Sequence, residues 1–223
     1  MPRSFVDLFV NDEGEPTGEG LLGKPEFFIS HWWGYKVLDL IAMIRAHDEQ
    51  HVAAGNPPAA YFFDMFILNQ WQMTMNCTAD EAKLNELVDG LRSSLQACGT
   101  LVLCCAAGTS GLAGWESPAP FARVWCLFEV YVAITEDVGV VVTLSENEEV
   151  GFQKALQKNN GIARVENALA NLDARNASAS VPDDKDLIMA KIEGGVGVEA
   201  FNERVRECML AEFKRISTSA AMR

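Results

Sequence analysis

Thr100-Leu101-Val102-Leu103-Cys104-Cys105 is an apolar run that has no polar position on either side of the chain after its first residue. A strand that is apolar on both faces needs cover on both faces, as in the parallel sheets of α/β proteins. A helical leucine pattern precedes the run and ends at Gly99, and Thr78 and Glu81 have capping-box spacing ahead of that pattern. The run therefore predicts a buried strand of a parallel sheet, with a helix before it.

Other segments repeat this alternation of apolar strands and helical patterns. Three further strands are expected at Phe27–Ser30, 61–67 and 138–144. Helices are expected from Val37 to about Ala54, from Ser117-Pro118 onward, and over 146–158. Right-handed crossovers give the order 2-1-3-4, and Ile162–Val165 is compatible with a short fifth strand. We therefore predict an α/β fold with a flavodoxin-like parallel sheet, of order about 2-1-3-4-5, flanked by helices.

The chain divides into three regions by composition and pattern. Residues 1–25 are rich in Gly, Glu, Asp and Pro, and are predicted to form an irregular lead-in. Residues 26–170 contain the alternating strands and helices. Residues 171–223 contain two amphipathic helical patterns joined by Gly194-Gly195-Val196-Gly197. We expect them to form a helical extension packed on the same domain.

The charge balance disfavours two classes of partner. The formal net charge is −13 and the sequence pI is about 4.6. Lys and Arg occur singly, without a basic stripe, so we expect neither nucleic acid nor an anionic membrane surface as a partner. No apolar run approaches the length of a membrane-spanning helix. The six cysteines include no C-x-x-C pair, which favours reduced, buried thiols and a cytoplasmic location.

Two histidines have the spacing of a helical zinc site, but the rest of that motif is missing. His47 and His51 are four residues apart, yet Asp48 stands where H-E-x-x-H has glutamate. His31 is the remaining histidine, so a third ligand would have to be a distant carboxylate. A solvated helix end is the better interpretation, and we predict no metal site.

Trp125-Cys126-Leu127-Phe128-Glu129 is the best candidate for chemistry. Positions i and i+4 share one helix face, so Trp125 and Glu129 project together. A carboxylate beside an indole can bind a nucleoside or stabilise a developing cation. The same pattern is also typical of an amphipathic helix with a core tryptophan and a glutamate at its edge. Trp32-Trp33, at a predicted strand end, can equally stack on a base or form an interface.

The same five residues resemble the W-C-L-x-E segment of TIR domains, where it follows the third strand and holds the glutamate that NAD+-cleaving members need. Phe27–Ser30 followed by Gly34 resembles the first-strand element F-x-S-x-x-G, and Phe63-Asp64 resembles the aspartate-bearing second strand. Ser30–Gly34 and the stretch from Phe63-Asp64 to Asn69-Gln70 also resemble the S-Y-x-W-G and W-I-D-x-x-C-I-N-Q stretches of fungal HET domains, which are TIR-like. The resemblance covers about residues 26–145.

This resemblance implies an NAD+ glycohydrolase that releases nicotinamide, with NAD+ as substrate and no further cofactor. It implies that Glu129 is the catalytic carboxylate and that Trp125 and Trp32 shape the pocket. Ser30 and Asp64 would contact the ribose or orient loops. The family also contains non-catalytic homotypic interaction modules, so the resemblance leaves enzyme and scaffold open. Because TIR-like domains generally act as assemblies, we expect a homo-oligomer.

Overall fold

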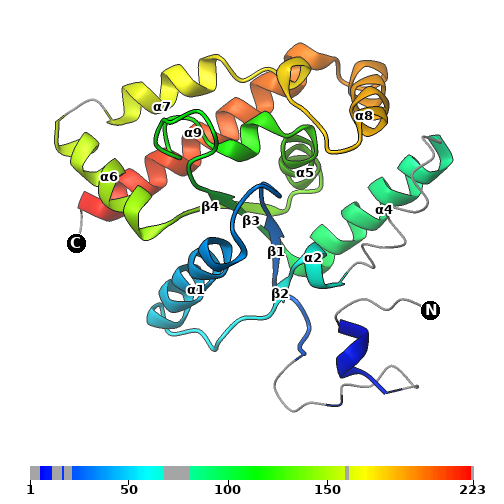
Figure 1. The fold of residues 1–223 in the computed structure, drawn as a ribbon, viewed down its shortest axis with the longest axis horizontal. Helices are drawn as coiled ribbons and strands as arrows, with labels where there is room; N and C mark the ends of the chain where they lie inside the picture. The colour runs from blue at the N-terminus through cyan, green and yellow to red at the C-terminus, as the bar shows by residue number, and fades with distance from the viewer. Residues whose placement is uncertain (1–5, 12–16, 18–21, 68–80, 159–160, 222–223) are drawn as a thin grey trace.

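The computed structural model describes residues 6–11, 17, 22–67, 81–158 and 161–221. Four strands of this part form one sheet in the order β2-β1-β3-β4 (Figure 1). They are β1 (Phe27–Ser30), β2 (Tyr61–Phe62), β3 (Thr100–Cys105) and β4 (Gly139–Leu144). Every pairing is parallel. The predicted α/β class and the order of the first four strands are therefore confirmed.

Helices join and cover these strands. The described helices are α1 (Val37–Ala53), α2 (Asp64–Ile67), α4 (Glu81–Cys98), α5 (Val124–Thr135), α6 (Glu146–Gln157), α7 (Gly161–Ala170), α8 (Pro182–Gly194) and α9 (Val198–Ala221). Short 3-10 turns are η1 (Val6–Phe9), η2 (Ala119–Ala122) and η3 (Ala174–Asn176). Gly99 links α4 to β3 with a φ of +77°, a left-handed conformation that suits glycine and ends the helix.

The alternating side chains of β3 divide the core into two layers. Leu101, Leu103 and Cys105 pack with residues of α4, α5 and α9, whereas Val102 and Cys104 pack with α1. Figure 1 shows α1 on one side of the sheet and α5 and α9 on the other. All five side chains are at most 1% exposed, which explains the absence of polar positions in this run.

The second strand is shorter than predicted. The sequence predicted a strand over 61–67, but only Tyr61 and Phe62 pair with β1, and Asp64–Ile67 form the short helix α2. The Asp64 carboxylate accepts a hydrogen bond from the Met65 backbone N–H at 2.7 Å. An aspartate bonded to its following backbone competes with strand pairing, and β2 is an edge strand with one neighbour to hold it. Asn69, Gln70 and Thr78 lie outside the described residues.

Two other expectations were wrong at the level of single elements. Ile162–Val165 belong to α7 rather than to a fifth strand, because Val165 and Leu169 recur with helical spacing and are both buried. The helix expected from Ser117-Pro118 is interrupted. The 3-10 turn η2 follows Pro118, and α5 begins at Val124.

The C-terminal helices share the main hydrophobic core. The two predicted helices correspond to α8 and α9, with residues 195–197 between them. The fully buried side chains Phe201, Val205, Met209 and Phe213 of α9 belong to the same cluster as Leu103 of β3. The extension therefore completes the cover of the sheet face that carries α5.

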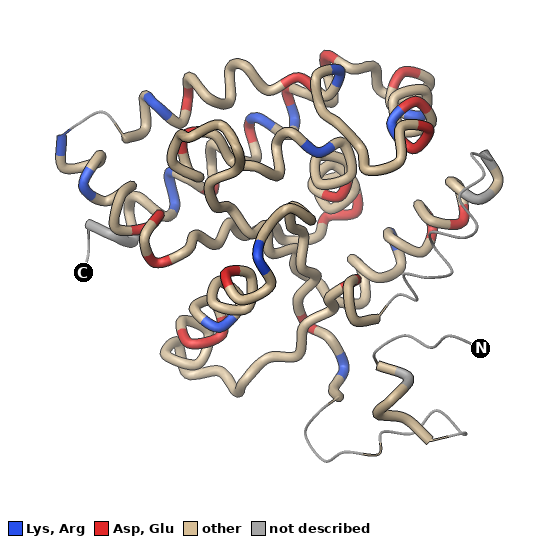
Figure 2. The backbone as a smooth tube through the Cα atoms, in the orientation of Figure 1, with Lys and Arg blue, Asp and Glu red and all other residues tan. Residues whose placement is uncertain are grey.

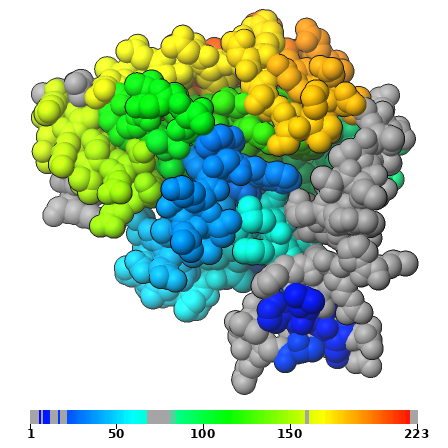
Figure 3. Space-filling view, viewed as in Figure 1, coloured from blue at the N-terminus to red at the C-terminus, as the bar shows by residue number. Residues whose placement is uncertain are grey.

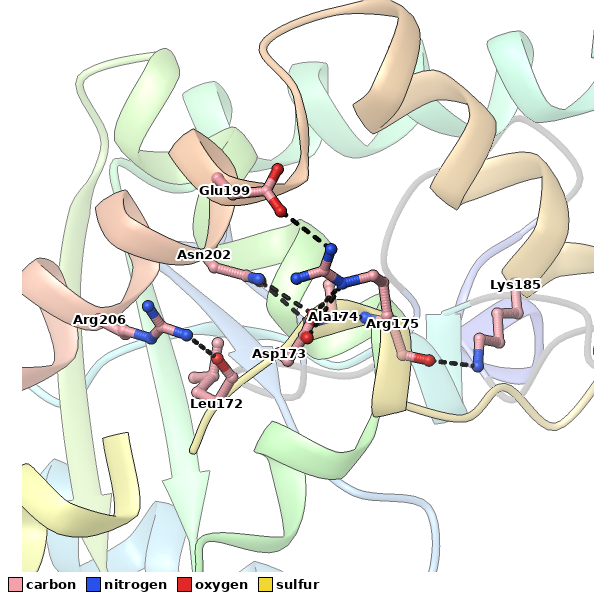
Figure 4. A network of polar contacts seen from close by, with 8 residues as sticks. All are labelled: Leu172, Asp173, Ala174, Arg175, Lys185, Glu199, Asn202 and Arg206. Atoms are coloured by element: carbon pink, nitrogen blue, oxygen red, sulfur yellow. Dashed lines mark hydrogen bonds and ion pairs between the residues drawn. The ribbon is translucent and has the colours of Figure 1, made fainter. Parts of the chain in front are cut away.

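A buried amide fastens the start of α9 to the segment after α7 (Figure 4). Asn202 is 2% exposed; its Oδ1 accepts from the Ala174 backbone N–H at 3.0 Å and its Nδ2 donates to Asp173 Oδ1 at 3.1 Å. Asp173 also accepts from the Arg175 backbone N–H and caps η3. Hydrogen bonds to Arg175 lower the pKa of Asp173. The network orders the chain just before α8.

Charges are interspersed over the described surface. Figure 2 shows Lys and Arg separated along the helices by Asp, Glu and uncharged residues. Within the described residues, no helix combines the length and the apolar character needed to cross a bilayer.

We predict that Asn202→Ala lowers the free energy of unfolding by about 1–3 kcal/mol, because the buried Ala174 N–H loses its acceptor. Urea denaturation measures this change. Glu199→Ala is the matched control on α9, because it removes a solvent-exposed ion pair with Arg175 and should change stability by less than about 0.5 kcal/mol. Equal effects of the two substitutions would contradict a stabilising role for the buried amide.

Candidate functional site

The last residue of β1 meets the second turn of α5. Ser30 pairs in register with Leu103, so its side chain lies on the sheet face that α5 covers. There the Ser30 hydroxyl donates a hydrogen bond of 2.5 Å to Glu129 Oε2. Ser30 is 1% exposed, and Glu129 is partly buried. Strand parity thus joins two predicted site residues that are 99 positions apart.

Burial controls the protonation of Glu129. Burial, and to a smaller extent the nearby charge of Asp64, raise the pKa of this carboxyl, which comes to about 8. The Ser30 hydroxyl and the charge of Arg123 act in the opposite direction and lower the pKa, but they do not outweigh burial. Glu129 is therefore mostly protonated at pH 7, unlike a surface glutamate. A carboxyl that titrates near neutral pH is a common feature of catalytic sites.

Asp64 lies beside this pair, at the start of α2. It accepts hydrogen bonds from the Met65 backbone and from the side chain of Trp33. Burial nevertheless raises its pKa. The electrostatic effect of Asp64 on Glu129 shows that the two carboxyl groups share one neighbourhood. Like-charge repulsion of this kind favours a state in which at least one of the two is protonated.

His31 is a buried member of the cluster that sequence reasoning did not select. It is 5% exposed, and its ring packs edge-on against Phe63 with centroids 5.0 Å apart. Its Nδ1 is 3.8 Å from Asp64 Oδ1, and its Nε2 is buried without a hydrogen-bond partner in the structure. Burial, helped by the charge of Arg123, lowers the pKa of His31 to about 4. The ring is therefore neutral near pH 7 and forms no ion pair with Asp64.

The three tryptophans near the site have different partners. Trp125 lies on the first turn of α5, and its Nε1 donates to Asp184 Oδ2 of α8 at 3.1 Å. Trp32 packs edge-on against Tyr35, with ring centroids 5.4 Å apart. The side chain that bonds to Asp64 belongs to Trp33, which is 52% exposed. Of Trp32 and Trp33, it is therefore Trp33 that contacts a candidate carboxylate.

Tyr35 fixes the turn that carries these residues. Its hydroxyl donates to the Ala106 carbonyl at 2.9 Å and accepts from the Ala106 N–H at 2.8 Å. Ala106 follows the last residue of β3, so both bonds join the turn after β1 to the end of β3. Burial strongly raises the pKa of Tyr35, which therefore stays neutral. The turn after β1 is held rigidly against the sheet edge.

Two further residues next to Glu129 were also missed. Cys126 is 4% exposed, and its Sγ donates to the His31 carbonyl at 3.3 Å. Burial raises the pKa of Cys126 well above its usual value, so it stays a thiol and is not a nucleophile. Arg123, just before α5, supplies the positive charge that acts on both Glu129 and His31. Its place in the chain carried no motif that would have singled it out.

Two surface hollows in the described residues lie away from Glu129. One surface hollow of about 410 Å³ is lined by residues of α1 and by Tyr61 and Phe63, and another of about 270 Å³ includes Arg164; neither includes Glu129. His47 hydrogen-bonds Tyr61 through Nδ1 at 2.8 Å, and the described residues contain no cluster of three metal-ligating side chains. We assign the candidate site to the Ser30–Glu129 cluster rather than to either hollow. Our reason is that the cluster holds a carboxyl with a raised pKa, a feature of catalytic sites.

Comparison of the chain with protein-family models, with curated proteins and with solved structures gave no match. The functional argument therefore rests on the chemistry of the cluster itself. The cluster combines a protonated carboxyl, a second carboxyl with a raised pKa, a neutral imidazole and one guanidinium at the carboxyl end of β1. When the Glu129 carboxyl is ionised, such an arrangement can stabilise a developing cation and can accept a proton from water.

We predict that Glu129 titrates with a midpoint near pH 8 in carbon-13 NMR of the side-chain carboxyl groups. Glu129→Gln should remove this signal and so assign it. Ser30→Ala should move the midpoint upward, because the hydroxyl favours the ionised form that it hydrogen-bonds. A midpoint between pH 4 and 5 in the wild-type protein would contradict the burial described for this carboxyl.

Proposed function

We propose that this protein is a TIR-like NAD+ glycohydrolase in which Glu129 is the catalytic carboxylate. The observation that carries the proposal is the part-buried hydrogen bond between Ser30 and Glu129, with Asp64 beside it. A glutamate that merely edged an amphipathic helix would face water and titrate normally. The order of the strands and the position of α5 after β3 are compatible with the resemblance.

The chemistry of NAD+ cleavage suits a carboxyl with a raised pKa. The nicotinamide ring is cationic, and it leaves as a neutral molecule when it takes the electron pair of the broken C–N bond. No acid is needed for that departure, while the ribose becomes oxocarbenium-like, as in glycoside hydrolysis. The cationic ring would favour ionisation of Glu129 on binding. The carboxylate would then stabilise the ribose cation and accept the proton of the attacking water.

The neighbouring residues would support this role. Ser30 would orient the Glu129 carboxylate through the hydrogen bond already present in the protein. Asp64 would keep the local electrostatic potential negative. A cationic transition state would then be more stable in the site than in bulk water. Trp125 and Trp33 would supply apolar walls, and Trp32 would act through the packing of the turn. The free thiols Cys98, Cys104, Cys105, Cys126 and Cys208 support our proposal of a cytoplasmic location.

We predict that Glu129→Gln reduces NAD+ cleavage by at least about a hundredfold, the scale of losing one electrostatic stabiliser. The change removes charge while keeping size, so kcat should fall more than KM rises. Chromatographic detection of nicotinamide measures the rate. Glu146→Gln, an exposed change on α6, is the control and should retain wild-type activity. If the wild-type protein cleaves NAD+ and Glu129→Gln cleaves it equally fast, the catalytic assignment of Glu129 is wrong.

A second candidate function is that of a self-associating interaction module, which an exposed apolar surface favours. Trp33 (52%), Val37 (43%), Leu38 (79%) and Ile41 (37%) are all exposed, and they follow one another along the turn and the first helical turns of α1. We call these four residues the α1 surface. Apolar surface of this kind costs free energy in a monomer and is typical of interfaces. Homotypic contact through the α1 surface is compatible with catalysis in the same assembly.

We predict that Leu38→Asp shifts the protein toward the monomer in analytical ultracentrifugation, because an interface would have to bury the new charge. The fold should be unaffected, since Leu38 is 79% exposed. Leu112→Asp is the matched control, because Leu112 is also exposed (52%) but lies in the loop after β3. A wild-type protein that stays monomeric at high concentration would refute self-association.

A further inference from the structure

Residues 178–184 run from the stretch after η3 into the first turn of α8. They contact the start of α5, the helix that carries Glu129. The Val124 backbone N–H donates to the Ser178 carbonyl at 3.0 Å, and the Ser178 N–H donates to the Ala122 carbonyl at 2.8 Å. These bonds form a parallel bridge between Arg123 and Ser178. We call residues 178–184 the bracing segment. Figure 3 shows the yellow-to-orange surface of this region next to the blue surface of the turn after β1.

The bracing segment also holds two side chains that border the site. Ser180 Oγ accepts a hydrogen bond from the Arg123 guanidinium at 2.9 Å. Asp184 Oδ2 accepts from Trp125 Nε1 at 3.1 Å. Backbone and side-chain contacts therefore converge on three consecutive positions of the α5 start, residues 123–125. Each contact is made by a residue that lies outside the region of the TIR-like resemblance.

We propose that the bracing segment is a positioning element of the Glu129 site, in which Ser180 orients Arg123 and Asp184 orients Trp125. The inference rests on the proposed function where it concerns catalysis, because Trp125 would line the substrate pocket. The C-terminal extension would then be part of the site as well as part of the core. A catalytic site needs such support, because side chains on the first turn of a helix are otherwise free to change rotamer.

The charge of Arg123 gives the bracing segment an electrostatic effect on Glu129. The groups around this carboxyl are Ser30 at the end of β1, Asp64 on α2 and Cys126 on α5. His31, which follows β1, lies beside Asp64 and is neutral near pH 7. Among these groups and Arg123, the guanidinium is the group that brings positive charge near pH 7. Its charge lowers the pKa of Glu129. A guanidinium released from Ser180 would spend part of its time in solvent and act less on the carboxyl.

Ser180→Ala tests the electrostatic half of the proposal without changing any charge. The carbon-13 midpoint of Glu129 should rise in Ser180→Ala and rise further in Arg123→Gln, while Arg123→Lys should restore it in part. Ser178→Ala is the matched control, because its hydroxyl bonds the Ala122 carbonyl and not Arg123. If both variants are folded and the Glu129 midpoint in Ser180→Ala equals that in Ser178→Ala, the role given to Ser180 is wrong.

Asp184→Ala tests the second contact, with Asp183→Ala as a control of equal charge on the first turn of α8. The nitrogen-15 indole resonance of Trp125 should shift in Asp184→Ala and not in Asp183→Ala. In Asp184→Ala, kcat/KM for NAD+ should also fall about tenfold or more, because a substrate-contacting group is misplaced. An unmoved indole resonance would overturn the positioning role. A shifted resonance in a protein that never cleaves NAD+ would support the contact and refute the proposed function instead.

Discussion

The structure depends on the requirement that β3 be covered on both faces. Every side chain from Leu101 to Cys105 is removed from water, so helices must lie on each side of the sheet. At about 25 cal/mol per Å² of apolar surface, this burial is a large stabilising contribution to the fold. The two-sided burial of β3 places α1 on one face of the sheet and α4, α5 and α9 on the other. Parallel pairing with β1 and β4 then brings their carboxyl ends to one edge.

The candidate site follows from that arrangement through strand parity. In β1, Ile29 faces α1, while Phe28 and Ser30 face α5. A polar residue at the last position of the α5 face must find a hydrogen-bond partner, since a buried hydroxyl without one costs about 1–3 kcal/mol. Glu129 is that partner. The pairing satisfies Ser30, and in return it keeps a carboxyl in a poorly solvated place.

Much of this architecture could be predicted from the sequence, because buried strands and amphipathic helices have distinct periods. The helical spacing singled out Glu129, and the resemblance implied roles for Ser30 and Asp64; the structure places all three near one another. The errors arose where local chemistry competed with periodicity. Asp64 bonds its own neighbour and starts α2, so the apolar run after it does not extend the strand.

The remaining site residues could not be predicted because their roles depend on tertiary contacts. His31 follows β1 as an ordinary turn residue, and its burial depends on Phe63 of a separate segment. Arg123 matters because Ser180 lies next to it in space, 57 positions away in the chain. Trp125 was expected to project together with Glu129, but the bond from its indole N–H to Asp184 carries no signal in the sequence. Spacing along one helix cannot reveal a partner on another.

The protonation of Glu129 also bears on the choice between an enzyme and a scaffold. Its pKa rises from an ordinary 4.5 in the unfolded chain to about 8 in the folded protein. The stabilising contribution of the protonated form is thus complete below about pH 4.5 and is lost as the pH rises toward 8. At neutral pH the fold therefore bears a cost that glutamine would avoid. The catalytic role proposed above would make use of this carboxyl, because a transient cation beside Glu129 would favour its ionised form.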